Sequence, residues 1–392
     1  MNVESFQSSP IGVLQRIQGH DRYLDRGYDH FAYIPRPLPS VFDLAQRTYK
    51  LVSEAERAIG RLDAAVGQVP NPLLLVRPAM YREAASTSAM EGTYAPLAEV
   101  LEADYVAEKE QSREVREIRN VIRATDRGLE LLERKPICQT VLNELQAILV
   151  RGTPSDGANA GQLRTGQVYI GERRNGIEKS RFVPPPNGPA LVEGMDRWEK
   201  WINAEDDIPL VVKIAMGHYQ FETLHPYLDG NGRLGRLVIV LQLVEAKALA
   251  YPLLDLSSWL APRKDEYKNH LLELSRTGLC DPLIQFIAEG LSVSSKNGME
   301  RIERLQQVRL ELVTRLKADG ARGLALDLVD DLISSPFITA SRAAERHGVT
   351  YPPANNAIQR MVRLGILDQV GERSYGRVYV SRAVLAAVDE PI

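Results

Sequence analysis

The sequence has little of what marks secreted, zinc-binding or membrane proteins. Its 392 residues include two cysteines, Cys138 and Cys280, which lie far apart and belong to no Cys-x-x-Cys or Cys/His cluster. Neither a disulfide framework nor a zinc site is supported by that spacing. No apolar run approaches the ~18 residues of a membrane span, and residues 1–30 contain no stretch suited to a signal peptide. We therefore expect a cytoplasmic protein.

A strong charge of either sign is also missing. The formal net charge is -3, with 44% hydrophobic and 25% charged residues, which is the composition of an ordinary soluble protein. The overall charge gives no electrostatic reason to expect nucleic-acid or membrane binding, so any basic surface must be local. Because single cores stop growing near about 250–300 residues, the length predicts two or three domains.

Helical periodicity dominates what is present. Apolar residues recur at three- and four-residue spacing, and the fold class expected is mainly α. Residues 1–30 lack clear periodicity and are expected to form an arm or a loosely packed extension. The helices predicted are 41–59, 79–90, 96–105, 112–133, 139–150, 189–202, 209–224, 233–248, 266–277 and 282–291, with a connecting helix at 297–317.

Two regions break the helical pattern. Residues 168–183 contain two short β-prone runs around an Arg-Asn-Gly turn signal, which predicts a small β-hairpin between helices. Near the C-terminus, helices at 340–347 and 352–364 are followed by a β-prone hairpin with turn signals at Gly371 and 374–376. That order predicts a winged helix-turn-helix. The ranges expected are an N-terminal extension (1–30), a helical region (31–115), a catalytic core (116–292), a linker helix (293–322) and a winged-helix domain (323–392).

The segment 225–236, His-Pro-Tyr-Leu-Asp-Gly-Asn-Gly-Arg-Leu-Gly-Arg, is the part of the sequence that suggests chemistry. Gly230 and Gly232 permit backbone shapes that other residues resist, so the N–H groups around Asn231 can converge on an anion. The apolar helix predicted to follow directs its positive N-terminal end to the same place. This segment therefore predicts a phosphate-binding loop.

Four charged or titratable side chains of the same segment complete the chemistry. Arg233 and Arg236 are three residues apart, so on the first helical turn they can both grip the far phosphates of a triphosphate. Asp229 can hold Mg²⁺ between phosphate oxygens. A protein hydroxyl is a poor nucleophile until a base accepts its proton, and His225 suits that task at neutral pH.

Taken together, these residues resemble the signature of the Fic family, His-Pro-Phe-x-Asp/Glu-Gly-Asn-Gly-Arg-x-x-Arg, from which the sequence departs at Tyr227 in place of Phe. The tyrosine is a conservative change if its hydroxyl finds a partner. The resemblance implies a Fic-type helical bundle that moves AMP from ATP onto a target hydroxyl and releases pyrophosphate. It assigns His225 as base, Asp229 as Mg²⁺ ligand, Gly230 to Gly232 as anion hole, and Arg233 and Arg236 as the polyphosphate grip.

The same resemblance assigns two further elements. The hairpin at 168–183 falls where the family has its flap, which pairs with the target backbone; Ile177, Lys179, Arg181 and Phe182 would frame the target pocket. Residues 87–92, Thr-Ser-Ala-Met-Glu-Gly, resemble the family's inhibitory motif Ser/Thr-x-x-x-Glu-Gly/Asn. Gly92 is a natural helix terminator, which leaves Glu91 at the negative end of a helix, where a carboxylate is disfavoured. By family analogy Glu91 pairs with Arg236 and restrains the reaction, with Thr87 as the motif's first residue.

The C-terminal region leaves a rival class of function open. Residues 335–385 carry seven arginines and three acids, which is compatible with contacts to DNA phosphates. Asn355, Asn356, Gln359 and Arg360 are candidate contacts to bases or backbone. The alternatives are a DNA-binding regulator with a nucleotide-sensing Fic core, a winged helix that docks protein, a Fic enzyme that transfers phosphocholine, and one that also removes AMP through Glu91. The target protein is not encoded in the motif, and self-modification and a homodimer remain open.

Overall fold

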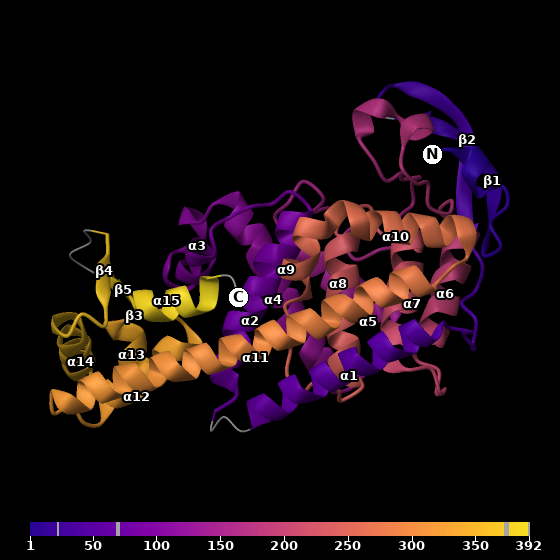
Figure 1. Cartoon of the computed structure of the whole chain (residues 1–392). Coiled ribbons are helices and arrows are strands. Elements are labelled where there is room, and N and C mark those ends of the chain that lie inside the picture. The colour runs from indigo at the N-terminus through magenta and orange to yellow at the C-terminus, as the bar shows by residue number, and fades with distance from the viewer. Residues whose placement is uncertain (22, 68–70, 372–375, 391–392) are drawn as a thin grey trace. The chain divides into compact units, whose positions relative to one another are not determined.

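The computed structural model describes residues 1–21, 23–67, 71–371 and 376–390, and it shows a mainly helical chain with small antiparallel sheets (Figure 1). The chain divides into two compact units. Unit 1 contains Met1–Arg57, Asn120–Ala248 and Trp259–Ser292, and unit 2 contains Ala58–Arg119, Leu249–Ser258 and Val293–Ile392. The division falls within four helices, namely α1 (Gln46–Gly67), α4 (Arg113–Leu132), α9 (Leu256–Leu260) and α11 (Asp281–Ala318).

The centre of unit 1 is built from α7 (Leu210–Leu224) and α8 (Asn231–Glu245), which pack on each other and are buried along almost their whole length. Apolar residues on every side of a helix require cover on every side. Neighbouring helices supply it: α8 also packs on α5 and α7 on α6. The unit also contains α5 (Gln139–Leu149), α6 (Pro189–Ile202), α10 (Lys264–Thr277) and the 3-10 turns η1 (Val3–Phe6) and η6 (Ala261–Arg263).

The expectation of a loosely packed arm at residues 1–30 is wrong. The strands β1 (Gly12–Asp21) and β2 (Arg26–Pro35) form an antiparallel hairpin that pairs over its full length, from Gly12 opposite Pro35 to Asp21 opposite Arg26. The rings of Phe6, Tyr33 and Phe182 lie 5.4–6.0 Å apart in a small core beneath it. Three of its eight described buried residues, Ile177, Phe182 and Val183, come from far along the chain, so local periodicity could not reveal it.

The segment 168–183 returns on itself as expected, but it does not form two strands. A single β-bridge joins Ile170 to Phe182, and between them lie the 3-10 turns η4 (Arg173–Asn175) and η5 (Ile177–Lys179). The carbonyl of Val183 accepts from the N–H of Tyr33 in β2 at 2.9 Å. The end of the segment therefore pairs with the N-terminal hairpin instead of extending its own ladder.

Unit 2 contains a helical part and a C-terminal part. The helical part comprises α2 (Leu73–Met90), α3 (Leu97–Glu102) and the turns η2 (Ala103–Tyr105) and η3 (Glu108–Glu110). In the C-terminal part, three short strands form an antiparallel sheet in the order β3-β5-β4. Its elements in chain order are α12 (Leu324–Ser334), β3 (Phe337–Thr339), α13 (Ala340–Arg346), α14 (Tyr351–Arg363), β4 (Asp368–Val370), β5 (Val378–Val380) and α15 (Arg382–Asp389).

Most predicted helices are present, but two of them start several residues from the predicted position and two others are joined into one. The first helix begins at Gln46 rather than at residue 41, and α2 begins at Leu73, so Pro78 lies inside it. The two helices expected at 282–291 and 297–317 are one continuous helix, α11, because the residues between them include neither proline nor glycine. The turn signals at residues 374 and 375 lie outside the described residues, whereas Gly371 has the expected positive φ of 66°. Among the described helices, none is long and apolar enough to span a bilayer.

Candidate active site

His225 lies where α7 ends. It is the C-cap residue, its N–H donates to the carbonyl of Phe221 at 2.9 Å, and its backbone is left-handed with φ 47° and ψ 62°. That conformation is uncommon for a residue other than glycine, although histidine is among those that tolerate it. The carboxylate of Glu222 lies 3.9 Å from Nδ1, and the imidazole is about one-fifth exposed at 22%. The position combines a fixed backbone, a nearby negative charge and access to solvent.

The loop after His225 is closed by the side chain of Asn231. Its Oδ1 accepts from the N–H of Tyr227 at 2.9 Å, and its Nδ2 donates to the carbonyl of the same residue at 2.8 Å. The ring of Tyr227 is fully buried, and its hydroxyl donates to Oδ1 of Asn143 at 2.8 Å. The expectation that this hydroxyl finds a partner is confirmed. Asn231 thus shapes the loop with its side chain, which leaves its backbone N–H as the group that can meet an anion.

Gly230 starts α8. Its φ of 81° and ψ of 3° place it in the left-handed region, where glycine carries no steric penalty. The first hydrogen bond of the helix runs from Leu234 N–H to the Gly230 carbonyl at 2.9 Å. The N–H groups of the first turn of α8, before Leu234, have no acceptor within the helix. The helix dipole is positive at this end. The loop therefore offers the geometry in which an anion is bound by backbone N–H groups.

Asp229 lies at the mouth of this loop, with its side chain 44% exposed. One carboxylate oxygen accepts from the N–H of Gly230 at 2.7 Å and lies 3.7 Å from Nη2 of Arg233, and the other accepts from Oγ of Ser155 at 2.8 Å. Among the described residues, no group of three or more His, Cys, Asp or Glu side chains is placed to hold a metal ion. A single exposed carboxylate suits Mg²⁺, which commonly takes one or two protein ligands and completes its shell with phosphate oxygens and water.

Arg233 and Arg236 are both buried, with 5% and 3% of their surface exposed. Between them, Gly235 allows close approach of α7: an added Cβ would lie 2.6 Å from Oε1 of Glu222. The carbonyl of Gly235 lies 3.2 Å from Nδ1 of His218, whose Nε2 lies 2.6 Å from the hydroxyl of Tyr267. Since a carbonyl only accepts, Nδ1 carries the proton and Nε2 accepts from the tyrosine. Burial and the charge of Arg236 lower the pKa of His218 to about 3.

Comparison with known proteins identifies the family of this chain. Residues 136–243 match the profile described as Fic/DOC family, and residues 49–130 match the profile described as Fic/DOC family N-terminal. The chain belongs to the Fic/DOC family. The predicted resemblance to Fic proteins is therefore confirmed at the level of the family.

The curated relatives match the Fic region alone. The Drosophila melanogaster protein named "Protein adenylyltransferase Fic" is 33% identical over 137 residues, which is 34% of this chain and 24% of the relative. The protein of the same name from Drosophila yakuba is 34% identical over 138 residues, with the same shares of 34% and 24%. The match thus spans about a quarter of each relative's length.

Solved Fic structures share the fold over more of the chain. A Fic family protein from Desulfovibrio desulfuricans G20 superposes with a TM-score of 0.56 at 20% identity, over 88% of this chain and 98% of its own. A variant of a Fic-1 fragment from C. elegans gives 0.51 at 21% identity, over 66% and 76%. At 20% and 21% sequence identity, these superpositions show that the fold is similar and show nothing about activity.

The segment 168–183 of this Fic protein is less open than its expected role as a flap suggests. Ile177 and Phe182 are 1% and 6% exposed, because they pack in the core beneath the β1–β2 hairpin. Arg181 donates to Oδ1 of Asn269 at 2.6 Å, and Lys179 is exposed. Contact with a target through the backbone and Lys179 stays a prediction. A framing role for the side chains of Ile177 and Phe182 does not fit their burial.

The residues predicted to inhibit the reaction lie in unit 2 of the Fic protein. Thr87 is 1% exposed within α2, Glu91 is the C-cap of that helix, and Gly92 has a φ of 93°. The prediction that Gly92 terminates the helix and leaves Glu91 at its negative end is therefore confirmed. Since Arg236 belongs to unit 1, the pair between Glu91 and Arg236 stays a prediction.

Several residues of the site escaped the sequence reasoning. Asn143 holds the Tyr227 hydroxyl, Ser155 holds Asp229, and Gln146 donates to the Asp229 carbonyl at 3.0 Å. Arg164 and His218 contact the two ends of the motif from other elements. No local pattern distinguishes these polar residues from polar residues exposed to solvent.

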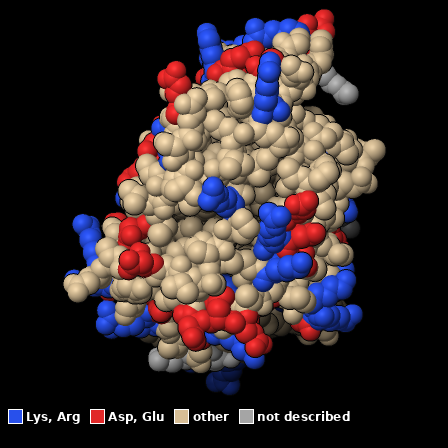
Figure 2. Space-filling view, turned by 90° about the vertical axis from the view of Figure 1, so that its right-hand side faces the viewer, with Lys and Arg blue, Asp and Glu red and all other residues tan. Residues whose placement is uncertain are grey.

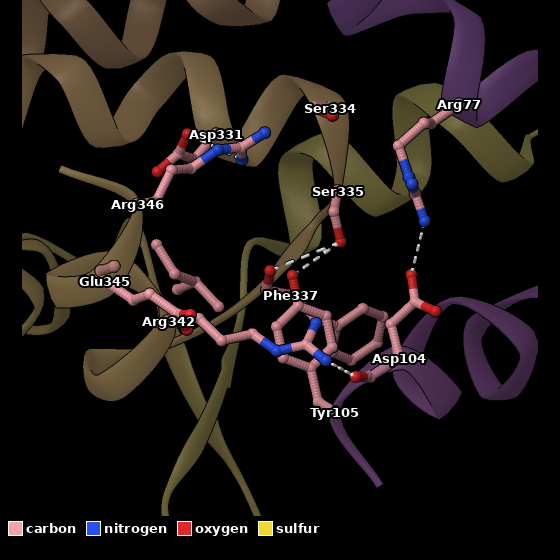
Figure 3. Close-up of a pocket in the computed structure, with 12 residues that line it drawn as sticks. Arg77, Asp104, Tyr105, Asp331, Ser334, Ser335, Phe337, Arg342, Glu345 and Arg346 are labelled. Carbon is pink, nitrogen blue, oxygen red and sulfur yellow. Dashed lines mark hydrogen bonds and ion pairs between the residues drawn. The ribbon is translucent and has the colours of Figure 1, made fainter. Parts of the chain in front are cut away.

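Unit 2 contains a separate pocket of about 310 Å³ between the helical part and α12, β3 and α13 (Figure 3). Arg342 reaches across it, with its guanidinium 4.4 Å from the centre of the Tyr105 ring and a hydrogen bond to the Asp104 carbonyl. Arg77 pairs with the Asp104 carboxylate at 2.9 Å. No residue of the segment 225–236 lines this pocket. Arg346 pairs with the Asp331 carboxylate at 2.9 Å, so two arginines of this pocket are already engaged by carboxylates.

Proposed function

We propose that this Fic protein is a protein adenylyltransferase that transfers AMP from ATP to a hydroxyl side chain of another protein. One observation carries the proposal: the segment 225–236 is folded into a loop that opens on the N-terminus of α8, with His225 and Asp229 partly exposed beside it. Relatives that share this region are named adenylyltransferases, which supports the same reaction.

In the proposed reaction His225 accepts the proton of the target hydroxyl. The oxygen then forms a bond to the α-phosphorus of ATP, and the bond from that phosphorus to the bridging oxygen breaks, so pyrophosphate leaves with its electron pair. The N–H groups of Asn231 and Gly232 receive phosphate oxygens at the helix terminus, whereas the N–H of Gly230 is engaged by the Asp229 carboxylate. The guanidinium groups of Arg233 and Arg236 hold the outer phosphates.

Asp229 fits the role of the protein ligand of Mg²⁺. Its carboxylate is 44% exposed and lies at the edge of the loop, so a cation there would have both a protein oxygen and room for phosphate oxygens. Bound Mg²⁺ supplies charge neutralisation across the polyphosphate. Ser155 and the N–H of Gly230 orient the carboxylate through their hydrogen bonds.

Mass spectrometry of the purified protein incubated with ATP and Mg²⁺ tests the activity. We expect an AMP adduct on the protein itself or on an added target. His225→Ala should lower the rate by at least about 100-fold, the usual contribution of a general base. An adduct that forms equally fast in the His225→Ala protein would refute the assignment of the base, and no adduct under any condition would refute the transfer of AMP.

We also propose that Glu91 restrains the enzyme by pairing with Arg236, which would occupy the guanidinium needed by the γ-phosphate. Glu91→Gly should then raise auto-modification with labelled ATP by about 10-fold or more, since the loss of a charge-assisted pair is typically worth 1.5–3 kcal/mol. Glu99→Gly, an acidic residue of the neighbouring α3, is the matched control. Unchanged labelling in the Glu91 variant would contradict the restraint.

For the C-terminal part we propose a winged helix-turn-helix with α14 as the presented helix, because the order α12, β3, α13, α14, β4, β5 follows that topology. Two of its four candidate DNA contacts are already engaged. Gln359 donates to the Tyr379 hydroxyl at 2.8 Å, and Arg360 pairs with Asp319 at 2.6 Å. Of the two candidate partners, this favours protein over DNA.

The remaining expectations about partners rest on the family. Self-modification, a homodimer and removal of AMP with help from Glu91 follow from the resemblance, and the choice of ATP over a phosphocholine donor follows from the intact motif. Trapping the modified partner and sequencing its labelled peptide would identify both the target and the modified hydroxyl.

A further inference from the structure

Arg164 contacts both the loop of the proposed base and the start of the segment 168–183. Its Nε donates to the His225 carbonyl at 2.8 Å, and one Nη donates to the Leu224 carbonyl at 3.3 Å. Its own backbone N–H donates to the Pro226 carbonyl at 2.9 Å. The residue thus binds three successive carbonyls at the point where α7 ends and the motif begins.

The same guanidinium holds the base of the segment 168–183 on both sides. Nη1 donates to the Gly166 carbonyl at 3.2 Å, and Nη2 donates to the Pro185 carbonyl at 2.5 Å. Gln167 adds a bond to the Pro184 carbonyl at 3.1 Å. The two stretches of chain that enter and leave the segment are therefore joined to each other and to the His225 loop through one side chain.

The surroundings of Arg164 are unusual for a cation. The residue is 2% exposed, and in the part of the chain that the structure describes, every side-chain hydrogen bond it makes ends on a neutral carbonyl. Burial lowers the pKa of its guanidinium to about 10. The C-terminal end of α7 compensates in part, because the last carbonyls of a helix lack internal partners and carry its negative dipole. Burying a charged guanidinium costs free energy, because the cation loses its hydration. A buried arginine at this position therefore suggests a role beyond packing.

We propose that Arg164 is a positioning residue for the transfer reaction, which fixes the left-handed backbone of His225 and the base of the 168–183 segment relative to each other. The inference rests on the proposed adenylyltransferase function. Arg164 touches no reacting atom. It acts through the carbonyl of the residue that accepts the proton, and through the carbonyls that carry the segment expected to dock the target.

The test uses full-length protein with Glu91→Gly as background, so that labelling is measurable. Arg164→Met should lower kcat for AMP incorporation by about 100-fold, the cost of misplacing a reacting group by about 1 Å, with a change of less than about 3-fold in KM for ATP. Arg164→Lys, which keeps the charge without the planar fork, should also lose most of the rate. In Arg164→Ala, millimolar guanidinium should restore part of the rate, and the same concentration of ammonium should not.

Arg127→Met is the matched control. It removes an arginine of the same unit that pairs with Glu144 and Glu130 and contacts no part of the loop, so its rate should stay within about 2-fold. Equal rates for Arg164→Met and Arg127→Met would overturn the proposal.

Hydrogen exchange measured by mass spectrometry tests whether Arg164 holds the His225 loop and the 168–183 segment in place, even if no AMP is transferred. Arg164→Met should raise exchange in peptides covering 224–232 and 166–187 and leave α14 unchanged. A uniform rise across the chain would mean that Arg164 only stabilises the fold, and no rise in the two peptides would mean that it positions nothing. If the Glu91→Gly protein incorporates no AMP, the proposed function fails while these exchange results still apply to Arg164.

Discussion

At the scale of single residues, the site depends on groups that hold backbone rather than on groups that face a substrate. Asn231 binds the backbone of Tyr227 through both atoms of its amide, and Tyr227 in turn is held by Asn143. Such bonds fix a loop within a fraction of an ångström, which is the precision that phosphoryl transfer requires. The geometry of the loop therefore depends on residues such as Asn143 and Tyr227, which take no part in the chemistry.

Tyr227→Phe is the residue-scale prediction. The phenylalanine of the family signature fits the same space, so the rate of AMP incorporation should stay within about 2-fold. The Asn143 oxygen loses its donor in a half-buried site, which should lower the free energy of unfolding by about 1 kcal/mol. Denaturant unfolding of both proteins measures this difference. A large loss of activity at full stability would show that the hydroxyl takes part in the reaction.

At the scale of elements, the contact between α7 and α8 places the two arginines. Gly235 lets the helices approach so closely that an added Cβ would lie within 3.2 Å of Glu222, Phe221 and His218, and the carbonyl of Gly235 binds His218. A larger residue at 235 would push α8 away from α7. The N-terminal turn of α8 carries Arg233 and Arg236, so it would move as well.

The buried histidine of that contact predicts a pH dependence. The pKa of His218 is lowered from 6.5 to about 3, so the unfolded chain takes up a proton below pH 6.5 that the folded chain refuses until about pH 3. The stability due to this residue is therefore complete above pH 6.5. It falls by up to about 1.4 kcal/mol for each pH unit as the pH drops through that window.

Melting temperatures between pH 7 and pH 4 check the prediction. His218→Gln keeps an acceptor for Tyr267 and a donor for Gly235 but does not titrate. Its melting temperature should fall less steeply with pH than that of the unaltered protein. Identical slopes would contradict the assignment of a neutral, buried His218.

At the scale of the whole molecule, the formal net charge is -3 and gives no general attraction to DNA. Figure 2 shows one face, on which Lys and Arg are interspersed with Asp and Glu and a broad area carries neither. The candidate DNA contacts are not identified on this face, so the choice between partners depends on the contacts of α14 itself.

An electrophoretic shift assay with duplex DNA tests this directly. Because Gln359 and Arg360 are engaged within the protein and the net charge is -3, we expect no retained complex at about 150 mM salt. A complex that persists there, and that Arg363→Ala weakens, would establish the DNA-binding alternative. Arg127→Ala, outside the C-terminal part, is the control for unspecific loss of charge.

The sequence by itself determined what depends on neighbours along the chain. Most helices follow from apolar spacing, Gly92 ends α2 and Gly230 starts α8 because glycine tolerates positive φ, and the segment 225–236 is contiguous. The family follows from that segment. These features could be predicted because their physical causes act within a few residues.

Only the tertiary structure decided what depends on distant partners. The N-terminal hairpin owes its order to a core shared with Phe182 and Val183, and the same core buries Ile177 and prevents a second pair of strands. Arg164 acquires its role because α7 ends beside it. Its neighbours in sequence give no sign of this, since a buried cation and an exposed one have the same local pattern. The free energy of such sites comes from burial and from carbonyls supplied by the fold, and no linear pattern records these.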